Sequence, residues 1–406
     1  MPKTNGIHYG WVIVLTGCFV VFGSLGLARF GYSIVLPAMQ ADLGMDHAQA
    51  GLLATADLFS YLLLSIAGGL LAARHGPRIV IAWGLACAGV GMMLTAAARG
   101  LASAAACRML TGAGSGASNV PMMGLLAAWT TARTRGLAAG IVVAGSSLGL
   151  IVLGPTVPRL IAALGPSGWR AAWLLLGVAA LVLSAVAAVY LRNRPSELGL
   201  APLGATDPAA PSAAGHRPPL WRDVYRAPGV LHLGGVYTAF GFSYVIYMTF
   251  FVQRLVAEGG YSHAAAGRLF MMMGACSLIC GVLWGAVSDR LGRRRTLVMI
   301  YLLHAVAFSL YALARSPAGF TVSAVLFGLS AWSIPAVMAA ACGDVTGPRL
   351  APAALGFVTI FFGIGQAAGP ILGGAVADAT GSLSSALLLA AAAAAAGALG
   401  SVFLRE

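Results

Sequence analysis

Charged residues are scarce in this sequence. Of its 406 residues only 9% are charged, and Asp and Glu together number 11. An ordinary soluble domain carries about 25% charged residues, so the scarcity excludes that class. Hydrophobic residues make up 59% of the chain and the mean hydropathy is +0.89, which places the chain in a lipid bilayer.

The motifs of familiar enzymes are also absent. The sequence has no P-loop, no G-x-S-x-G and no H-E-x-x-H pattern, so neither ATP hydrolysis nor familiar hydrolytic chemistry is expected. All six cysteines fall inside apolar segments, and none has the His or carboxylate neighbours of a metal site. We therefore expect no enzymatic activity, no metal and no cofactor.

The net charge of +13 does not indicate a nucleic-acid partner. Most basic residues stand singly or in pairs in the short breaks between apolar runs, and no basic helix face is interleaved with aromatic residues. We expect the partners to be the lipid bilayer and a transported solute, with the chain acting as a monomer.

Long apolar runs dominate what is present. Twelve segments have the length of about 20 residues that a bilayer-spanning helix needs. We predict an all-α membrane protein whose spans cover 11–39, 48–73, 79–98, 102–127, 136–158, 169–191, 229–253, 263–287, 296–314, 318–342, 351–376 and 383–403.

Lys and Arg are distributed unevenly over the breaks between these spans. With the N-terminus inside, sixteen fall on the inner side and six on the outer side, so the positive-inside rule predicts that both termini are cytoplasmic. The longest polar interval is rich in Pro, Ala and Gly and predicts a flexible cytoplasmic linker. The predicted domains are a six-helix bundle at 1–191, the linker at 192–228 and a second six-helix bundle at 229–406.

Two of the breaks repeat each other. GGLLAARHGPR, 68–78, follows the second span, and WGAVSDRLGRRR, 284–295, follows the eighth. Both resemble the loop signature of the major facilitator superfamily, and the resemblance covers essentially the whole chain. It implies two six-helix bundles around a central cavity, in the bacterial inner membrane. It also implies gating roles for Asp289, Arg290, Arg293, Arg74 and Arg78. Because Ala73 replaces the acid of the first copy, we expect the two loops to contribute unequally to closure.

A second resemblance is narrower. RTRGLAAGIVVAGSSLG, 133–149, resembles the fifth-helix signature of the monocarboxylate porter branch, which is grouped with oxalate–formate antiporters. HYGW, 8–11, resembles the way such chains enter the first helix. Small residues at this spacing also suit any tightly packed helix pair. The glycines here and in GIGQAAGPILGG, 363–374, therefore indicate either a static packing seam or a bending point.

Two opposite charges lie deep inside the first two spans. Arg29 lies ten residues inward from Met39, a depth of roughly 15 Å at 1.5 Å per residue, and Asp57 lies at about the same depth in the second span. Charges at that depth are costly and mark functional paths more often than not. We expect an ion pair between Arg29 and Asp57, either as a structural clamp or linked to protons and substrate.

Helical spacing extends this predicted site. Offsets of four, seven and eleven residues from Phe22 place Gly26, Arg29 and Ser33 on one face of the first span. The same pattern joins Arg108 to Asn119 in the fourth span. Arg108 resembles the fourth-helix arginine that the superfamily often links to proton coupling, although a snorkelling position near the outer surface is the alternative.

An aromatic stripe runs along the seventh span. It consists of Tyr237, Phe240, Tyr244, Tyr247 and Phe251. Three hydroxyls on one face make poor lipid contacts, so we expect the stripe to face inward, although packing alone is the alternative. Trp332 and Gln366 are further candidates for the cavity wall.

The sequence as a whole predicts a secondary active transporter that moves a small organic anion, expected to be a monocarboxylate, with a proton. The predicted substrate-binding residues are Arg29, Ser33, Asn119, Tyr237, Tyr244, Tyr247, Trp332 and Gln366. The residues predicted for proton coupling are Asp57, Arg29 and Arg108. One excess positive charge within the spans suits one carboxylate. The alternatives are a proton-coupled exporter of drugs or hydrophobic metabolites and a non-transporting membrane sensor.

Overall fold

The computed structural model describes residues 8–205, 224, 227 and 229–404. Within these residues the regular secondary structure is helical, and the one β-bridge joins Thr130 to Leu203. Continuous apolar helices are what a bilayer demands, because each backbone N–H and C=O must be satisfied within its own segment.

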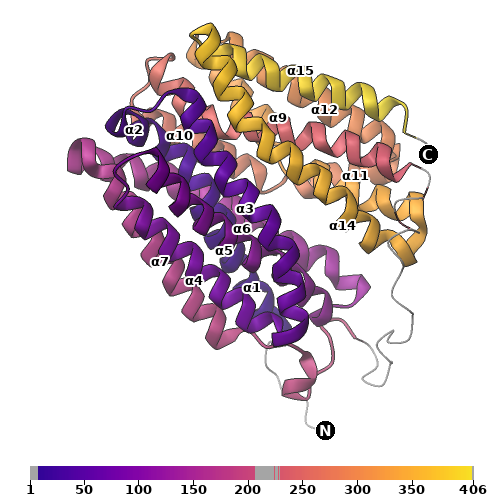
Figure 1. The fold of residues 1–406 in the computed structure, drawn as a ribbon. Coiled ribbons are helices and arrows are strands. Elements are labelled where there is room, and N and C mark those ends of the chain that lie inside the picture. The colour runs from indigo at the N-terminus through magenta and orange to yellow at the C-terminus, as the bar shows by residue number, and fades with distance from the viewer. Residues whose placement is uncertain (1–7, 206–223, 225–226, 228, 405–406) are drawn as a thin grey trace.

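The first six spans form the N-terminal bundle, coloured indigo to magenta in Figure 1. Three consecutive elements make up the first span: α1 (Gly10–Val21), the π-helix η1 (Phe22–Phe30) and α2 (Gly31–Leu43). The other five spans are α3 (His47–His75), α4 (Pro77–Ala96), α5 (Leu101–Trp129), α6 (Ala132–Leu164) and α7 (Gly168–Tyr190), and the 3-10 turn η2 (Gly165–Ser167) joins the last two.

The last six spans form the C-terminal bundle, coloured orange to yellow. Its helices are α9 (Val230–Ala257), α10 (His263–Ser277), α11 (Cys280–Leu291), α12 (Arg293–Leu313), α13 (Pro317–Gly328), α14 (Ser333–Thr380) and α15 (Leu383–Val402). Gly347, with φ 75°, breaks α14, so the first part of α14 completes the tenth span and the second part forms the eleventh.

The predicted spans all coincide with helices. Among the described helices, ten are long and apolar enough to cross a membrane, and the pair α10 and α11, bent by 42°, makes eleven. The remaining span is α5, which has 29 residues but is less apolar because it carries Arg108, Asn119 and many Gly and Ser residues. The prediction of twelve spans in two six-helix bundles is confirmed.

The predicted linker at 192–228 lies for much of its length outside the described residues. The part that is described holds the 3-10 turn η3 (Pro195–Leu198), and Leu203 pairs with the end of α5. There the Leu203 N–H donates to the carbonyl of Trp129 at 2.8 Å, and Thr131 N–H donates to the Leu203 carbonyl at 3.1 Å. This stretch therefore returns to the N-terminal bundle.

Contacts between the two bundles gather at one end of the molecule, the end that holds the start of α3 and the end of α14 (Figure 1). Here Gly51 of α3 lies directly against the carbonyl of Pro370 in α14, and Gly154 of α6 lies against Gly267 of α10. A side chain at either glycine would collide with the opposite backbone. At the other end, Gly69 of α3 has only open space where a side chain would be. The bundles are thus in contact at the first end, and their ribbons diverge toward the second (Figure 1).

Candidate functional site

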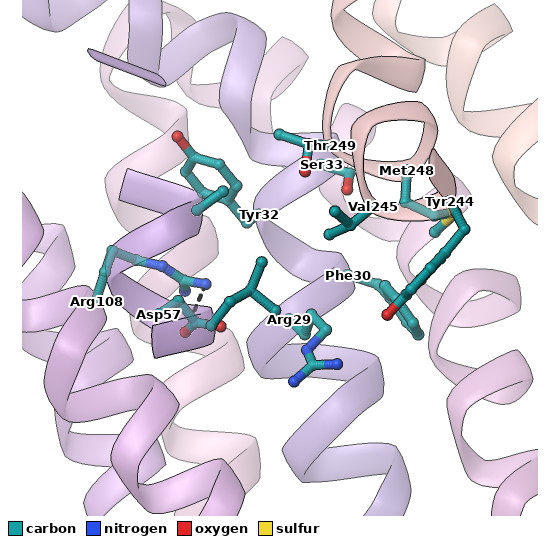
Figure 2. Close-up of a pocket in the computed structure, with 12 residues that line it drawn as sticks. Arg29, Phe30, Tyr32, Ser33, Asp57, Arg108, Tyr244, Val245, Met248 and Thr249 are labelled. Carbon is teal, nitrogen blue, oxygen red and sulfur yellow. Dashed lines mark ion pairs between the residues drawn. The ribbon is translucent and has the colours of Figure 1, made fainter. Parts of the chain in front are cut away.

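A small cavity lies between the bundles, where η1, α2, α3 and α5 face α9 (Figure 2). Its volume is about 20 Å³, room for roughly one water molecule. Its lining residues are Arg29, Phe30, Tyr32, Ser33, Ala54, Asp57, Leu58, Arg108, Tyr244, Val245, Met248 and Thr249. The cavity therefore joins the intramembrane charges of one bundle to an aromatic and apolar wall of the other.

Asp57 of α3 forms an ion pair with Arg108 of α5. The Arg108 Nη2 atom lies 2.8 Å from Oδ1 of Asp57, and the two side chains are 1% and 3% exposed. Nη1 of Arg108 donates to the carbonyl of Ala28 at 3.1 Å. The rings of Tyr32 and Trp173 each lie 5.0 Å from its Cζ atom. Both charges are thus compensated and kept away from lipid.

The predicted ion pair between Arg29 and Asp57 is wrong, and so is the snorkelling alternative for Arg108. Asp57 pairs with Arg108 and not with Arg29, and Arg108 is 1% exposed and so does not snorkel. The close packing of α3 and α5 explains the pairing. Gly112, one turn after Arg108, lies directly against the backbone carbonyl of Asp57, where a side chain would not fit. This approach brings the Arg108 guanidinium to the Asp57 carboxylate.

The π-helix η1 decides where Arg29 points. Its hydrogen bonds run from i to i+5, so each turn takes more residues than an α-helical turn, and Gly26 no longer shares a face with Arg29 and Ser33. Gly26 faces Gly149 of α6, whereas Arg29 and Ser33 line the cavity. Figure 2 shows Arg29 and Arg108 pointing in different directions from their helices.

Arg29 rests on the ring of Tyr61, a residue of α3 that the sequence analysis missed. The Cζ atom of Arg29 lies 4.2 Å from the ring centre. Its Nε and Nη2 atoms are buried and have no hydrogen-bond partner among the described residues. Contact through the flat face leaves the N–H groups at the edge of the guanidinium free for a planar anion.

Asn119, a predicted substrate ligand, supports this ring instead of lining the cavity. Its Nδ2 donates to the hydroxyl of Tyr61 at 2.8 Å. Tyr61 follows Asp57 by four residues on the same helix, so the helical spacing that located Ser33 from Arg29 would also have found it.

The C-terminal bundle contributes aromatic and neutral polar groups. Tyr244 of α9 lines the cavity, and its hydroxyl accepts a hydrogen bond from Nε2 of Gln366 in α14. Trp332, in the turn between α13 and α14, stacks on Phe30 with ring centres 5.3 Å apart, and its Nε1 donates to Oγ of Ser147 at 3.2 Å. Trp332 and Gln366, predicted for the cavity wall, thus contact residues that line the cavity but are not themselves part of its lining.

The aromatic stripe of α9 divides between two environments. Tyr237 is 4% exposed and stacks on Phe362 at 4.6 Å, outside the cavity lining. Tyr247 is fully buried inside the C-terminal bundle, where its hydroxyl lies 3.0 Å from Oγ of Ser323. The structure therefore brings Tyr244 alone of the three tyrosines to the cavity.

The two repeated loops differ in their contacts. In the second loop Nη1 of Arg293 donates to Oδ1 of Asp289 at 2.7 Å, and Nε donates to Oδ2 of Asp344 at 3.3 Å. In the first loop Arg78 contacts neutral groups instead, since its Nε donates to the carbonyl of Ala188 at 2.8 Å. Arg74 and Arg290 are exposed.

Two helical bundles with opposed buried charges at their interface define a membrane transporter. The family described as "Uncharacterised MFS-type transporter YbfB" matches residues 21–401, and the chain belongs to this family of the major facilitator superfamily. The chain is therefore a multi-pass membrane transporter and not an enzyme.

Several curated relatives are named as transporters of organic anions. The probable sulfoacetate transporter SauU of Cupriavidus necator is 25% identical over 93% of this chain and 89% of its own length. The 4-hydroxybenzoate transporter PcaK of Pseudomonas aeruginosa is 29% identical over 73% of this chain and 70% of its own length. The probable galactarate/D-glucarate transporter GudP of Bacillus subtilis is 25% identical over 99% and 93%, respectively.

A solved structure shares the fold. It is that of a bacterial homolog of the human lysosomal transporter Spinster, in an inward-facing and unoccupied conformation. It matches with a TM-score of 0.75 over 100% of this chain and 96% of its own, at 16% identity.

Proposed function

We propose that this transporter carries a small organic monoanion, a monocarboxylate, together with a proton by alternating access. The observation that supports this most directly is the state of Arg29. Its guanidinium lies at the bundle interface, and two of its buried nitrogens have no partner in the described part of the chain, while Arg108 is neutralised by Asp57. An uncompensated buried charge is expensive, and a bound anion supplies the compensation.

One carboxylate suits this site. Arg29, Arg108 and Asp57 together leave a single positive charge around the cavity. A planar carboxylate can accept two parallel hydrogen bonds from the edge of a guanidinium. Ser33 and the Tyr244 hydroxyl, which line the same cavity, are then placed to complete the coordination. The names of the relatives support an organic anion as the cargo.

Proton coupling follows from the neighbouring pair. Asp57 lines the same cavity as Arg29, so a proton on its carboxyl group removes a negative charge from the site. The anion then binds to a more positive site, and by reciprocity a bound anion favours the protonated carboxyl. This mutual strengthening is the thermodynamic requirement for moving both in the same direction.

The conformation fits one step of such a cycle. With the termini in the cytoplasm of a bacterial inner membrane, the closed end of the bundles faces outward and the separated end faces the cell. We assign the loop with Asp289, Arg290 and Arg293 to the cytoplasmic gate, with Arg74 and Arg78 as its weaker counterpart. Arg293 of the second loop pairs with Asp289 and with Asp344 of α14, whereas Arg78 of the first loop donates to a neutral carbonyl, which supports unequal contributions.

The test is transport by the purified protein in proteoliposomes with a panel of radiolabelled carboxylates. Uptake of monocarboxylates should be faster with an acidic exterior than with the same pH on both sides of the membrane. The rate of entry into protein-free vesicles is subtracted from both. Unlabelled dicarboxylates should compete less well than monocarboxylates, and neutral amides of the same acids should not compete. Arg29→Gln should abolish the uptake, and Arg29→Lys should retain part of it because the charge remains without the planar fork.

Two results would overturn the proposal. Inhibition by neutral amides as strong as that by the acids would remove the need for an anion. Normal uptake by Arg29→Gln would remove Arg29 from the site. Either result would favour the exporter of hydrophobic metabolites, which the same vesicles would reveal as proton-driven movement in the opposite direction.

A further inference from the structure

The rings of Phe30 and Trp332 form a stacked pair that crosses the bundle interface. Their centres are 5.3 Å apart and their planes differ by 27°. Phe30 belongs to the N-terminal bundle and lines the cavity next to Arg29, whereas Trp332 belongs to the C-terminal bundle. The pair therefore stands beside the free guanidinium and connects two bodies that move relative to each other during alternating access.

Both rings come from irregular backbone in the middle of a span. Phe30 is the last residue of the π-helix η1, and Trp332 lies in the four-residue turn that separates α13 from α14. Irregular helical backbone within a membrane occurs where it lines a cavity, and π-helical segments are frequent at functional sites. Neither ring is fixed by a regular helix on both sides.

The rest of the cavity offers few polar groups that are free. The hydroxyl of Tyr32 already donates to the carbonyl of Ala50 at 2.7 Å, and that of Tyr244 accepts from Gln366, so its single remaining O–H serves the carboxylate of the cargo. Ser33 and Thr249 are the remaining hydroxyls in the lining. A cargo with many hydroxyl groups would lose its water without replacement hydrogen bonds, at a cost for each group.

From these observations we infer that the cargo is an arene carboxylate whose ring enters between Phe30 and Trp332 while its carboxylate binds Arg29. This inference rests on the proposed function and narrows its substrate class. The present cavity of about 20 Å³ is far too small for an arene, so the ligand ring replaces the contact between the two protein rings. The stacked pair of Phe30 and Trp332 is lost, and the ligand ring forms one new pair with each of them. The ligand thereby bridges the two bundles.

The test is equilibrium binding to the purified full-length protein in detergent with three monoanions. Benzoate has an aromatic ring, cyclohexanecarboxylate has the same charge and similar size without π electrons, and gluconate is a polyhydroxy acid. Benzoate should bind about fivefold more tightly than cyclohexanecarboxylate, the range expected for aromatic pairs. Gluconate should bind more weakly than both.

Substitution of the stacked rings should remove this preference. Trp332→Leu should weaken benzoate binding about fivefold and leave cyclohexanecarboxylate within twofold, whereas Trp332→Phe, which keeps a ring, should retain most of the preference. Phe30→Leu should act like Trp332→Leu. Trp83→Leu is the matched control, because Trp83 is 70% exposed on α4 and should change nothing.

The outcomes separate this inference from the proposed function. Equal binding of benzoate and cyclohexanecarboxylate, with both lost in Arg29→Gln, would refute the arene site and leave the anion site standing. A preference for benzoate that persists in both Trp332→Leu and Phe30→Leu would also refute it. Absence of binding by every acid, or unchanged binding in Arg29→Gln, would instead count against the proposed function.

Discussion

Asp57 and Arg108 form a buried ion pair on neighbouring helices of one bundle, with 2.8 Å between Oδ1 and Nη2. Among the residues that the structure describes, Arg29 then has no carboxylate partner at the bundle interface. Because Asp57 and Arg29 line the same cavity, a change of charge on the pair alters the field in which an anion would bind.

Replacing one partner of this ion pair should destabilise the protein more than replacing both partners. Asp57→Asn leaves Arg108 buried without its counter-charge, and Arg108→Gln leaves Asp57 in the same state. Each single substitution should lower the free energy of unfolding by about 3–5 kcal/mol. The double substitution should recover most of that loss and should still lack proton-driven uptake. Thermal unfolding in detergent, together with uptake in vesicles, measures both effects.

If the double variant loses as much free energy of unfolding as the two single variants together, the two side chains do not depend on each other. Proton-driven uptake with a normal pH dependence in Asp57→Asn would assign the proton site elsewhere. The Met109→Leu variant is a control for substitution on α5, because Met109 is 44% exposed on that helix.

The depth of a charged residue in the membrane could be predicted from the sequence, but the direction in which its side chain points could not. The count of residues placed Arg29 and Asp57 at similar depth, and the structure has both in the lining of one cavity. Which residue pairs with Asp57 depends on two features that the depth of a residue in the membrane does not reveal. One is the π-helical stretch Phe22–Phe30, whose hydrogen bonds change the helical phase, and the other is the close approach at Gly112.

The twelve spans and the two-bundle fold were predictable because each span is an apolar run of sufficient length. Tyr244 and Tyr247 illustrate what could not be predicted in the same way. They are three positions apart on one helix, yet Tyr244 reaches the cavity and Tyr247 packs beside Ser323. Which of two adjacent faces a membrane helix turns to a cavity depends on its neighbours, since hydropathy treats both faces alike.

Tyr61 should act as a positioning residue for Arg29. Tyr61→Leu removes the ring that lies 4.2 Å from Cζ of Arg29 and should weaken carboxylate binding about tenfold. Tyr61→Phe keeps the ring and loses only the hydrogen bond from Asn119, so binding should fall by no more than about threefold. The KM for uptake of the best carboxylate of the panel should rise while the maximal rate stays within twofold. Equal effects of the Phe and Leu variants would show that the ring face is unimportant.

His304 should prove to be a packed neutral side chain. It is fully buried in α12, with ring centres of Phe308 and Phe327 at 5.5 and 5.3 Å, and neither of its nitrogens has a hydrogen-bond partner among the described residues. His304→Phe removes this unsatisfied polar ring and should stabilise the protein by about 1 kcal/mol. The pH dependence of uptake should remain that of the parent. A variant that folds but loses proton-driven uptake would make His304 a proton carrier.

Asp378 should hold the bundles together at their closed end. Its Oδ1 and Oδ2 atoms accept hydrogen bonds from the backbone N–H groups of His47 and Ala48, at 3.0 and 2.7 Å. These N–H groups belong to the first turn of α3, where a carboxylate is favoured by both the unpaired donors and the helix dipole. Because Asp378 lies on α14, in the other bundle, these bonds exist only while this end is closed. Asp378→Ala should shift the equilibrium toward opening there by about 1 kcal/mol, or roughly fivefold.

Spin labels at Arg99 and Arg315 can report this opening, because both positions are exposed and lie in short loops of different bundles at that end. The population at longer distance should grow in Asp378→Ala and grow less in Asp378→Asn, whose side-chain oxygen can still accept one hydrogen bond. Glu197→Ala is the matched control, since Glu197 is an exposed acid in the turn η3, away from the closed end. An unchanged distance distribution in Asp378→Ala would mean that the glycine contacts alone, such as that of Gly51 with Pro370, keep this end closed.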